Sequence, residues 1–231
     1  MGEEAGGADH PVRGLGVAED GLRLVVADPE LARGRAATLA FRVVDERGAT
    51  VRDFDVAHTK RMHVIVLRRD LTGFQHLHPT LRADGTWATP LKLSAAGSYR
   101  LLADFERGGD KHTLASDLSV DGAADLQPLP APASTARSDG GYDVTVTRDG
   151  DLQRFAISRD GVPVQPEEYL GAAGHLVALR EGDLAFLHVH PTSDARAEFD
   201  VTLPTAGRYR LFLQFQHEGR VQTVAFTQEV S

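Results

Sequence analysis

Apolar and polar residues alternate along much of this chain, which is the period expected of β-strands with one buried face. The alternation is clear in the segments 22–26, 39–43, 99–105 and 142–146. Turn signals such as Asp84-Gly85 separate these segments at short intervals, and no segment shows the period of a helix. The pattern therefore predicts an all-β protein made of short antiparallel strands.

One stretch of the sequence is used twice. Residues 63–80, HVIVLRRDLTGFQHLHPT, align without a gap with residues 175–192, HLVALREGDLAFLHVHPT. The likeness continues in a Gly-x-Tyr-Arg motif that begins at Gly97 and again at Gly207, and in a final alternating strand of each copy. A duplication of this size indicates two repeats of one fold.

Short strands at near-regular intervals predict that the repeats are two tandem immunoglobulin-like antiparallel β-sandwich domains. Tyr99 and Tyr209 stand where such folds carry a tyrosine corner, in which the hydroxyl bonds to nearby backbone. The chain has no cysteines, so it lacks the inter-sheet disulfide of antibody domains, and we predict only an immunoglobulin-like sandwich. A small barrel is the structural alternative.

Composition indicates where the domains begin and end. Residues 1–16 are small and polar and are predicted to be flexible. The first sandwich should span residues 17–122 and the second residues 141–231, joined by a Pro/Ala-rich linker over 123–140. A linker of this length leaves two arrangements open, because the repeats could either pack as a pair or stay separate.

The histidines of the duplicated stretch are predicted to gather on one face of a β-hairpin. Strands at 63–67 and 74–78 flank a turn at 69–73, and side chains two apart on a strand share a face. The pairing that closes this turn sets His63 opposite His78, with His76 on the same side. Three imidazoles then meet on one face.

The second copy predicts a second cluster of the same kind. The same count sets His175 opposite His190, with His188 diagonal to it. Proline has no N–H for a strand ladder, so Pro79 and Pro191 should end each strand just past its last histidine.

Imidazole is a good ligand for Zn, Cu and Ni, and three convergent imidazoles can hold such an ion. The sequence therefore predicts Cu(II) or Zn(II), one per repeat. Cu(I) would prefer sulfur, and only Met1 and Met62 offer any, the latter on the face of its strand opposite His63. Metal affinity should collapse below roughly pH 6, since imidazoles with a pKa of about 6.5 then protonate.

Two further residues stand close to the candidate ligands in the sequence. His58 lies in a charged run and is expected at the surface, although it could complete the first site. Asp104 matches Gln214 in the second copy; it is either an exposed strand carboxylate or a partner that accepts an imidazole N–H.

Charge and motifs exclude several classes of function. The net charge of −8 argues against nucleic acid and against an anionic membrane surface as partners. No stretch reaches the roughly 20 apolar residues of a transmembrane helix, and no secretory signal is visible. No catalytic motif was found, so we expect a non-enzymatic metal-binding protein. The alternatives are a structural or protein-interaction module with structural histidines and, less favoured, a zinc lyase or hydrolase.

Four segments of the chain resemble a family of duplicated β-rich proteins common in actinobacteria and neighbouring groups. They are HTKRMHVIVLRRDLTGFQHLHP and GSYRLLADF in the first repeat, and YLGAAGHLVALREGDLAFLHVHP and GRYRLFLQFQHEG in the second. The likeness covers most of the chain from about Gly21. It implies an exported or lipid-anchored protein of the cell envelope, in a family loosely described as heavy-metal-binding. The candidate partners are a metal ion and an envelope protein. The recurring histidines of that family fall on the six positions His63, His76, His78, His175, His188 and His190.

Overall fold

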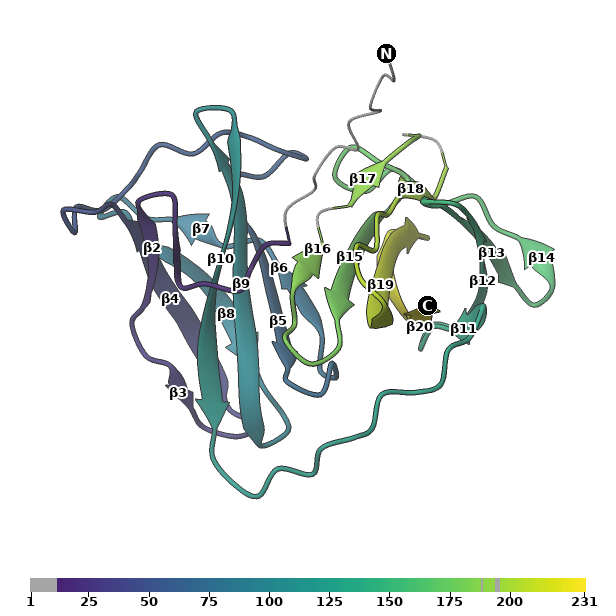
Figure 1. Ribbon diagram of the computed structural model, residues 1–231, viewed down its shortest axis with the longest axis horizontal. Coiled ribbons are helices and arrows are strands. Elements are labelled where there is room, and N and C mark those ends of the chain that lie inside the picture. Colours follow the sequence, from purple (N-terminus) through teal and green to yellow (C-terminus); the bar gives the residue numbers. More distant parts are fainter. Residues whose placement is uncertain (1–11, 188, 194–195) are drawn as a thin grey trace, which may run out of the picture.

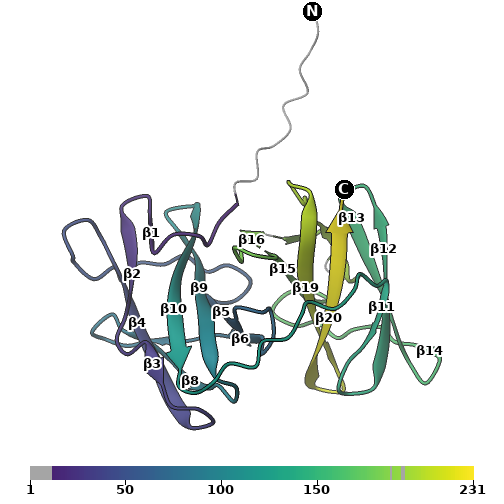
Figure 2. The same cartoon turned by 60° about the horizontal axis from the view of Figure 1, so that its bottom comes forward.

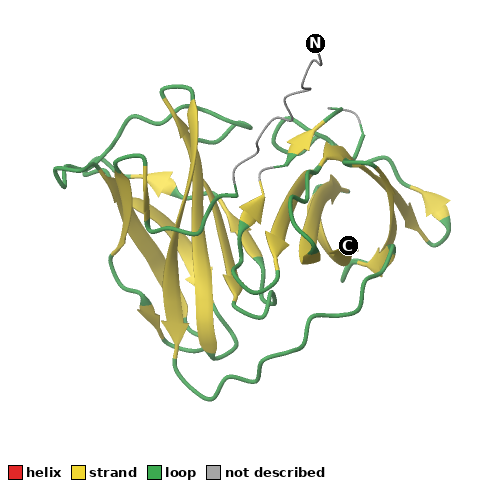
Figure 3. Cartoon of the chain, viewed as in Figure 1, coloured by secondary structure: helices red, strands yellow, loops and turns green. Residues whose placement is uncertain are grey.

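The computed structural model describes residues 12–187, 189–193 and 196–231. Strands and turns make up the described chain, and two β-rich bodies stand side by side (Figures 1 and 3). None of the described residues forms an apolar helix that is long enough to cross a membrane. The predicted class, two tandem immunoglobulin-like β-sandwiches from an internal duplication, is confirmed.

The first repeat is a sandwich of two five-stranded sheets, with strand orders β1-β2-β4-β8-β7 and β3-β10-β9-β5-β6. All the pairs are antiparallel except that of β3 with β10. The strands are β1 (Ala18–Glu19), β2 (Leu22–Val26), β3 (Glu30–Leu31), β4 (Ala36–Val44), β5 (His63–Arg68), β6 (Gln75–Leu77), β7 (Thr80–Leu81), β8 (Trp87–Lys92), β9 (Gly97–Arg107) and β10 (Asp110–Val120).

The second repeat has sheets of order β11-β12-β13-β18-β17, with β14 paired to β13, and β16-β15-β19-β20. Its strands are β11 (Thr135–Arg137), β12 (Tyr142–Asp149), β13 (Leu152–Arg159), β14 (Val162–Pro163), β15 (His175–Arg180), β16 (Phe186–Leu187), β17 (His190–Pro191), β18 (Glu198–Asp200), β19 (Gly207–His217) and β20 (Arg220–Val230).

The start of the second repeat and the N-terminal segment both differ from the boundaries that composition suggests. β11 pairs with β12, so the second sandwich takes its edge strand from the Pro/Ala-rich segment 123–140. Arg13 exchanges backbone hydrogen bonds with Phe186 of the second repeat, and the N–H of Gly14 donates to the carbonyl of Thr113 in the first. Residues 13 and 14 therefore pair with both repeats rather than forming part of a flexible segment.

A tyrosine corner is present in each repeat, as the sequence predicts. The Tyr99 hydroxyl donates to the carbonyl of Ala95 at 2.8 Å, and the Tyr209 hydroxyl donates to the carbonyl of Thr205 at 2.8 Å. Both tyrosine side chains are almost fully buried. Each corner thus anchors the long strand, β9 or β19, that forms the centre of the sheet facing the other repeat.

The two repeats pack as a pair, through the sheets that contain β5 and β15 (Figure 2). Strand β5 has no exposed residue, because one of its faces is covered by the core of the first sandwich and the other by the second repeat. Val64 and Val66 point into the core of the first sandwich, while Ile65 and Leu67 point toward the second repeat. We call the apolar contact between the repeats the inter-repeat face; its buried members are Ile65, Leu67, Leu71, Leu102, Ala115, Val177, Leu179, Leu184, Phe186 and Phe212.

The alternation along β5 decides which way its first residue points. His63 follows the odd-numbered side, with Ile65 and Leu67, so it lies at the edge of the inter-repeat face. Met62 takes the other side and is buried in the core of the first sandwich, as predicted. His63 is therefore placed between the repeats, and the sulfur of Met62 points away from it into the core of the first sandwich.

Candidate functional site

The hairpin β5–β6 brings three histidines together, which we call the histidine triad: His63, His76 and His78. Val64 pairs with Leu77 and Ile65 with His76, so the register continues to set His63 opposite His78, as predicted. The ring centroids lie 4.7–5.3 Å apart. One ring nitrogen from each residue lies within 4.8 Å of the other two. The triad therefore has the compactness of a metal site.

Hydrogen bonds hold two of these rings in opposite tautomers. Nε2 of His63 lies 3.2 Å from the carbonyl oxygen of Ala57, which can only accept, so Nε2 carries the proton and Nδ1 a lone pair. Nδ1 of His76 lies 2.7 Å from Oε1 of Gln214, so in this amide orientation Nδ1 carries the proton and Nε2 a lone pair. Each ring thus keeps one nitrogen for a ligand.

The two remaining nitrogens face each other. Nδ1 of His63 lies 3.1 Å from Nε2 of His76, a contact between two lone pairs when both rings are neutral. Burial lowers the pKa of His63 to about 4 and the pKa of His76 well below its usual value. A shared proton is therefore disfavoured at neutral pH, which leaves the two lone pairs directed at each other.

The third ring has a nitrogen with no hydrogen-bond partner. Nε2 of His78 is buried and unpaired among the described residues. Burial, with a smaller contribution from His63, lowers the pKa of His78 to about 4, so the ring is neutral. A buried polar atom without a partner is rare in folded proteins and costs stability unless a ligand satisfies it.

The second repeat copies part of this arrangement. Nε2 of His175 donates to the carbonyl of Tyr169 at 2.8 Å, six residues upstream, as His63 does to Ala57. The residue after each of those carbonyls, His58 or Leu170, has a positive φ in both repeats. The duplication has therefore preserved both the ring orientation and the shape of the loop that fixes it.

The rest of the predicted second cluster is only partly visible. His188 lies outside the described residues, and for His190 only the backbone is described. That backbone belongs to β17 and pairs with Asp200 of the opposite sheet, rather than with the predicted partner His175. β17 ends at Pro191, directly after His190, as predicted. In the first repeat the chain changes sheets later, between β6 and β7, with Pro79 at the change as expected.

A cavity of about 60 Å³ lies between the repeats, next to the triad. His63 and His76 line it from the first repeat, and His175 lines it from the second, with its ring centroid 6.3 Å from that of His76. The ring of His58 is exposed and lies 5.7 Å from His175, so this residue also joins the group. Apolar side chains form most of the remaining wall.

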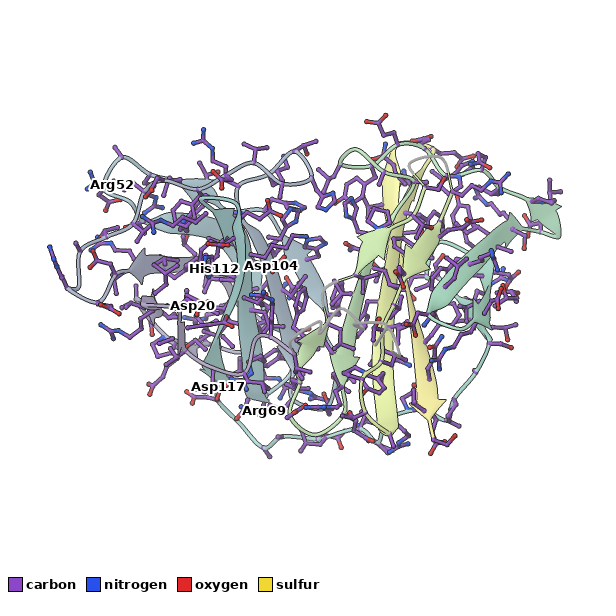
Figure 4. All side chains as sticks on the ribbon, turned by 45° about the horizontal axis from the view of Figure 1, so that its top comes forward. Asp20, Arg52, Arg69, Asp104, His112 and Asp117 are labelled. Carbon is purple, nitrogen blue, oxygen red and sulfur yellow. The ribbon has the colours of Figure 1, made fainter. Side chains whose placement is uncertain are left out.

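Asp104 lines the same cavity and is not an exposed carboxylate. It pairs with His63 across β5 and β9, and Figure 4 shows it on the side of the first repeat toward the second. Burial raises its pKa to about 6, while a 2.7 Å hydrogen bond from the Thr113 hydroxyl opposes the increase. Gln214 holds the equivalent place opposite His175.

Gln214 is the site residue that sequence reasoning missed. Its alignment with Asp104, opposite the leading histidine of each repeat, was the only available signal. The contact itself joins residues 138 positions apart and exists only because the repeats pack together.

Comparisons with known proteins identify a family but not an activity. A family model described as Domain of unknown function (DUF8832) matches residues 17–122 and 135–231. No curated protein matches the chain in sequence.

Several solved structures resemble the chain at low similarity. The Lin-41 filamin domain has 18% identity over 46% of this chain and 97% of its own, with a TM-score of 0.31. The Escherichia coli adhesin FdeC has 13% identity over 93% and 65%, with a TM-score of 0.32. Escherichia coli alpha-2-macroglobulin activated by porcine elastase has 13% over 90%, with a TM-score of 0.33, and the chain spans only 20% of its length. Scores this low carry no argument about function.

Proposed function

This chain belongs to the DUF8832 family, whose description assigns no activity, and we propose from the geometry of the histidine triad that it binds a divalent transition-metal ion. The ligands are Nδ1 of His63, Nε2 of His76 and one ring nitrogen of His78. Neutral imidazoles suit Cu(II) and Zn(II), and these are the ions we propose. The role is metal buffering, delivery or resistance in the cell envelope.

The observation that carries this proposal is the contact between Nδ1 of His63 and Nε2 of His76 at 3.1 Å. Two nitrogens bound to one ion at roughly 2.0–2.1 Å lie about 3.0–3.4 Å apart when the angle at the ion is about 95–110°. The observed separation falls within that range. Nε2 of His78, buried and without a hydrogen bond, is available as the third ligand.

Three protein ligands leave one coordination position for water or for an exchangeable ligand. An open position suits a protein that takes up an ion and passes it on. The residues of this chain do the positioning, because the carbonyl of Ala57 and the amide of Gln214 fix two of the rings, and the β5–β6 ladder sets their spacing.

A second candidate function is structural, and one observation favours it. His76 bonds to Gln214 and His63 bonds to Ala57, so the rings already tie the hairpin to the second repeat and to a neighbouring loop. In that case the chain is an interaction module and the imidazoles serve its internal hydrogen bonds. The unpaired nitrogen of His78 is the point on which this reading and the metal reading differ.

Metal content separates the two. Full-length protein is stripped with chelator, reloaded with Zn(II) or Cu(II), and its bound metal is counted by mass spectrometry. We expect wild type to bind at least one equivalent, and a His76→Ala/His78→Ala variant to lose one. His188→Ala/His190→Ala tests for a second equivalent in the other repeat.

A matched control is His217→Ala, since His217 bonds to the hydroxyl of Tyr142, away from the triad, and its loss should leave metal content unchanged. Wild type that retains no metal after reloading would overturn the proposal and leave the interaction module as the better account.

A further inference from the structure

We propose that Gln214 of the second repeat is a positioning residue for the metal site of the first, so that the packing of the two repeats completes the site. The inference rests on the proposed metal-binding function. It adds a residue outside the hairpin, and it predicts that a change in one repeat alters metal affinity in the other.

Gln214 is buried and is held at both ends of its amide. Oε1 lies 2.7 Å from Nδ1 of His76, and Nε2 donates to the hydroxyl of Thr223 at 3.1 Å. Thr223 is the direct cross-strand neighbour of Gln214 on β20. With its nitrogen engaged by Thr223, the amide presents its oxygen to the imidazole.

The orientation of this amide determines which nitrogen of His76 can bind a metal. An oxygen acceptor at Nδ1 keeps the proton there and leaves Nε2 unprotonated, pointing at His63. The ring of His63 is oriented in the same way by a carbonyl of its own repeat, that of Ala57, which accepts the hydrogen bond from Nε2. One ligand is therefore oriented locally and the other from across the inter-repeat face.

Aromatic packing next to this pair fixes its position. The rings of Phe74 and Phe212 stack with centroids 4.1 Å apart and planes 9° from parallel. Phe74 precedes His76 by two residues, and Phe212 precedes Gln214 by two, so the stack and the hydrogen bond are adjacent steps of the same contact between repeats. Disturbing the stack should displace the acceptor.

The chain itself suggests a conservative variant. At the position equivalent to Gln214 the first repeat carries Asp104. Each of these residues bonds to a cross-strand threonine, but Asp104 accepts from Thr113 whereas Gln214 donates to Thr223. A carboxylate can only accept, so Gln214→Glu keeps an acceptor for His76, whereas Gln214→Leu removes it. Gln153→Leu is the matched control, because Gln153 is also buried and bonds to Gln228, so both residues of this pair lie within the second repeat.

The test measures Zn(II) affinity of the full chain by competition with a chromophoric chelator. Gln214→Leu should weaken binding about 10- to 100-fold, the usual effect of removing a residue that orients a metal ligand. Gln214→Glu should stay within a few-fold of wild type, and Gln153→Leu should match wild type. The ¹⁵N chemical shifts of the His76 ring in metal-free protein report the tautomer, and they should change in Gln214→Leu only.

The outcomes distinguish this inference from the function on which it rests. If Gln214→Leu binds Zn(II) as wild type does while His76→Ala/His78→Ala loses it, the metal site stands and the role of Gln214 is refuted. If Gln214→Glu loses Zn(II) as fully as Gln214→Leu, the amide donates to His76 instead of accepting, which also refutes it. If the histidine double variant binds as wild type, the proposed function itself fails.

Discussion

The hairpins β5–β6 and β15–β16 began as the same sequence and now differ in what surrounds their leading histidines. His63 and His175 each donate from Nε2 to a carbonyl six residues upstream, so the local device is unchanged. Their cross-strand neighbours have diverged into a carboxylate, Asp104, and an amide, Gln214. Duplication therefore conserved the bond from the leading histidine to the loop carbonyl, while the cross-strand neighbour of that histidine diverged, and in the second repeat this neighbour contacts His76 of the first.

The largest expected effect is on metal binding at low pH. The pKa of His63 and of His78 in the folded protein is about 4, below the ordinary value of 6.5, because both rings are buried. They stay neutral as pH falls through 6, so Zn(II) binding by the first repeat should persist at pH 5 and be lost near pH 4. This revises the expectation, based on unperturbed imidazoles, of a collapse below roughly pH 6.

The same shifts set the pH dependence of folding in metal-free protein. Between pH 6.5 and 4 the unfolded chain binds more protons at these histidines than the folded chain does, so their effect is to lower stability as pH falls. Asp104 acts in the opposite sense, since its pKa is raised to about 6 and the folded state holds its proton more tightly. Urea unfolding from pH 7.5 to 4 should show a net loss of stability; a flat or rising profile would contradict it.

Phe212→Ala should break the pairing of the repeats. Removing a buried phenylalanine costs about 3–5 kcal/mol of unfolding free energy. Because Phe212 stacks on Phe74 next to the His76–Gln214 contact, Zn(II) affinity should also fall. Phe226→Ala, in the core of the second sandwich, is the control: urea unfolding should show a similar cost, but chelator competition should show unchanged affinity.

The tyrosine corners offer a smaller comparison between the repeats. The Tyr99 hydroxyl bonds to one backbone carbonyl, whereas the Tyr209 hydroxyl bonds to the carbonyl and the side-chain hydroxyl of Thr205. Tyr99→Phe should cost about 1 kcal/mol and Tyr209→Phe about 2 kcal/mol, since a buried hydrogen bond contributes roughly 1 kcal/mol. Equal costs in urea unfolding would mean that the side-chain hydroxyl of Thr205 adds nothing.

An effect of similar size to that of Tyr99→Phe is expected where two loops meet between the repeats. Thr59 has a φ of 64°, and its equivalent Gly171 has a φ of 83°. A Cβ on Gly171 would lie 3.9 Å from the side chain of Thr59, so the loops touch. A β-branched residue is strained in this region, so Thr59→Gly should stabilise the protein by about 1 kcal/mol and Gly171→Thr should destabilise it by at least as much. Thermal unfolding of both variants checks the signs.

Contacts set by local periodicity could be predicted from the sequence. The duplication, the tyrosine corners, the buried side of Met62 and the placement of His63 opposite His78 all follow from strand alternation and turn length. Contacts that depend on a change of sheet or on the packing of the repeats could not. His-x-His-Pro is the same motif in both copies, yet His190 already belongs to the opposite sheet, where it pairs with Asp200. Nothing in a single strand pattern indicates that Gln214 will meet His76.

The 138 residues that separate His76 from Gln214 also impose an order of events during synthesis. A ribosome delivers the N-terminal domain first, and such a domain folds as a unit before the next is made. During that interval the first repeat exposes Ile65, Leu67 and Leu102 to solvent, and His76 has no acceptor for its proton. A half-made chain would therefore be prone to aggregate through this apolar surface, and the tautomer of His76 would not be fixed. Translation of the second repeat covers the apolar surface and supplies the acceptor for His76 at the same time, so the ligands of the proposed metal site are in place only once the polypeptide is complete.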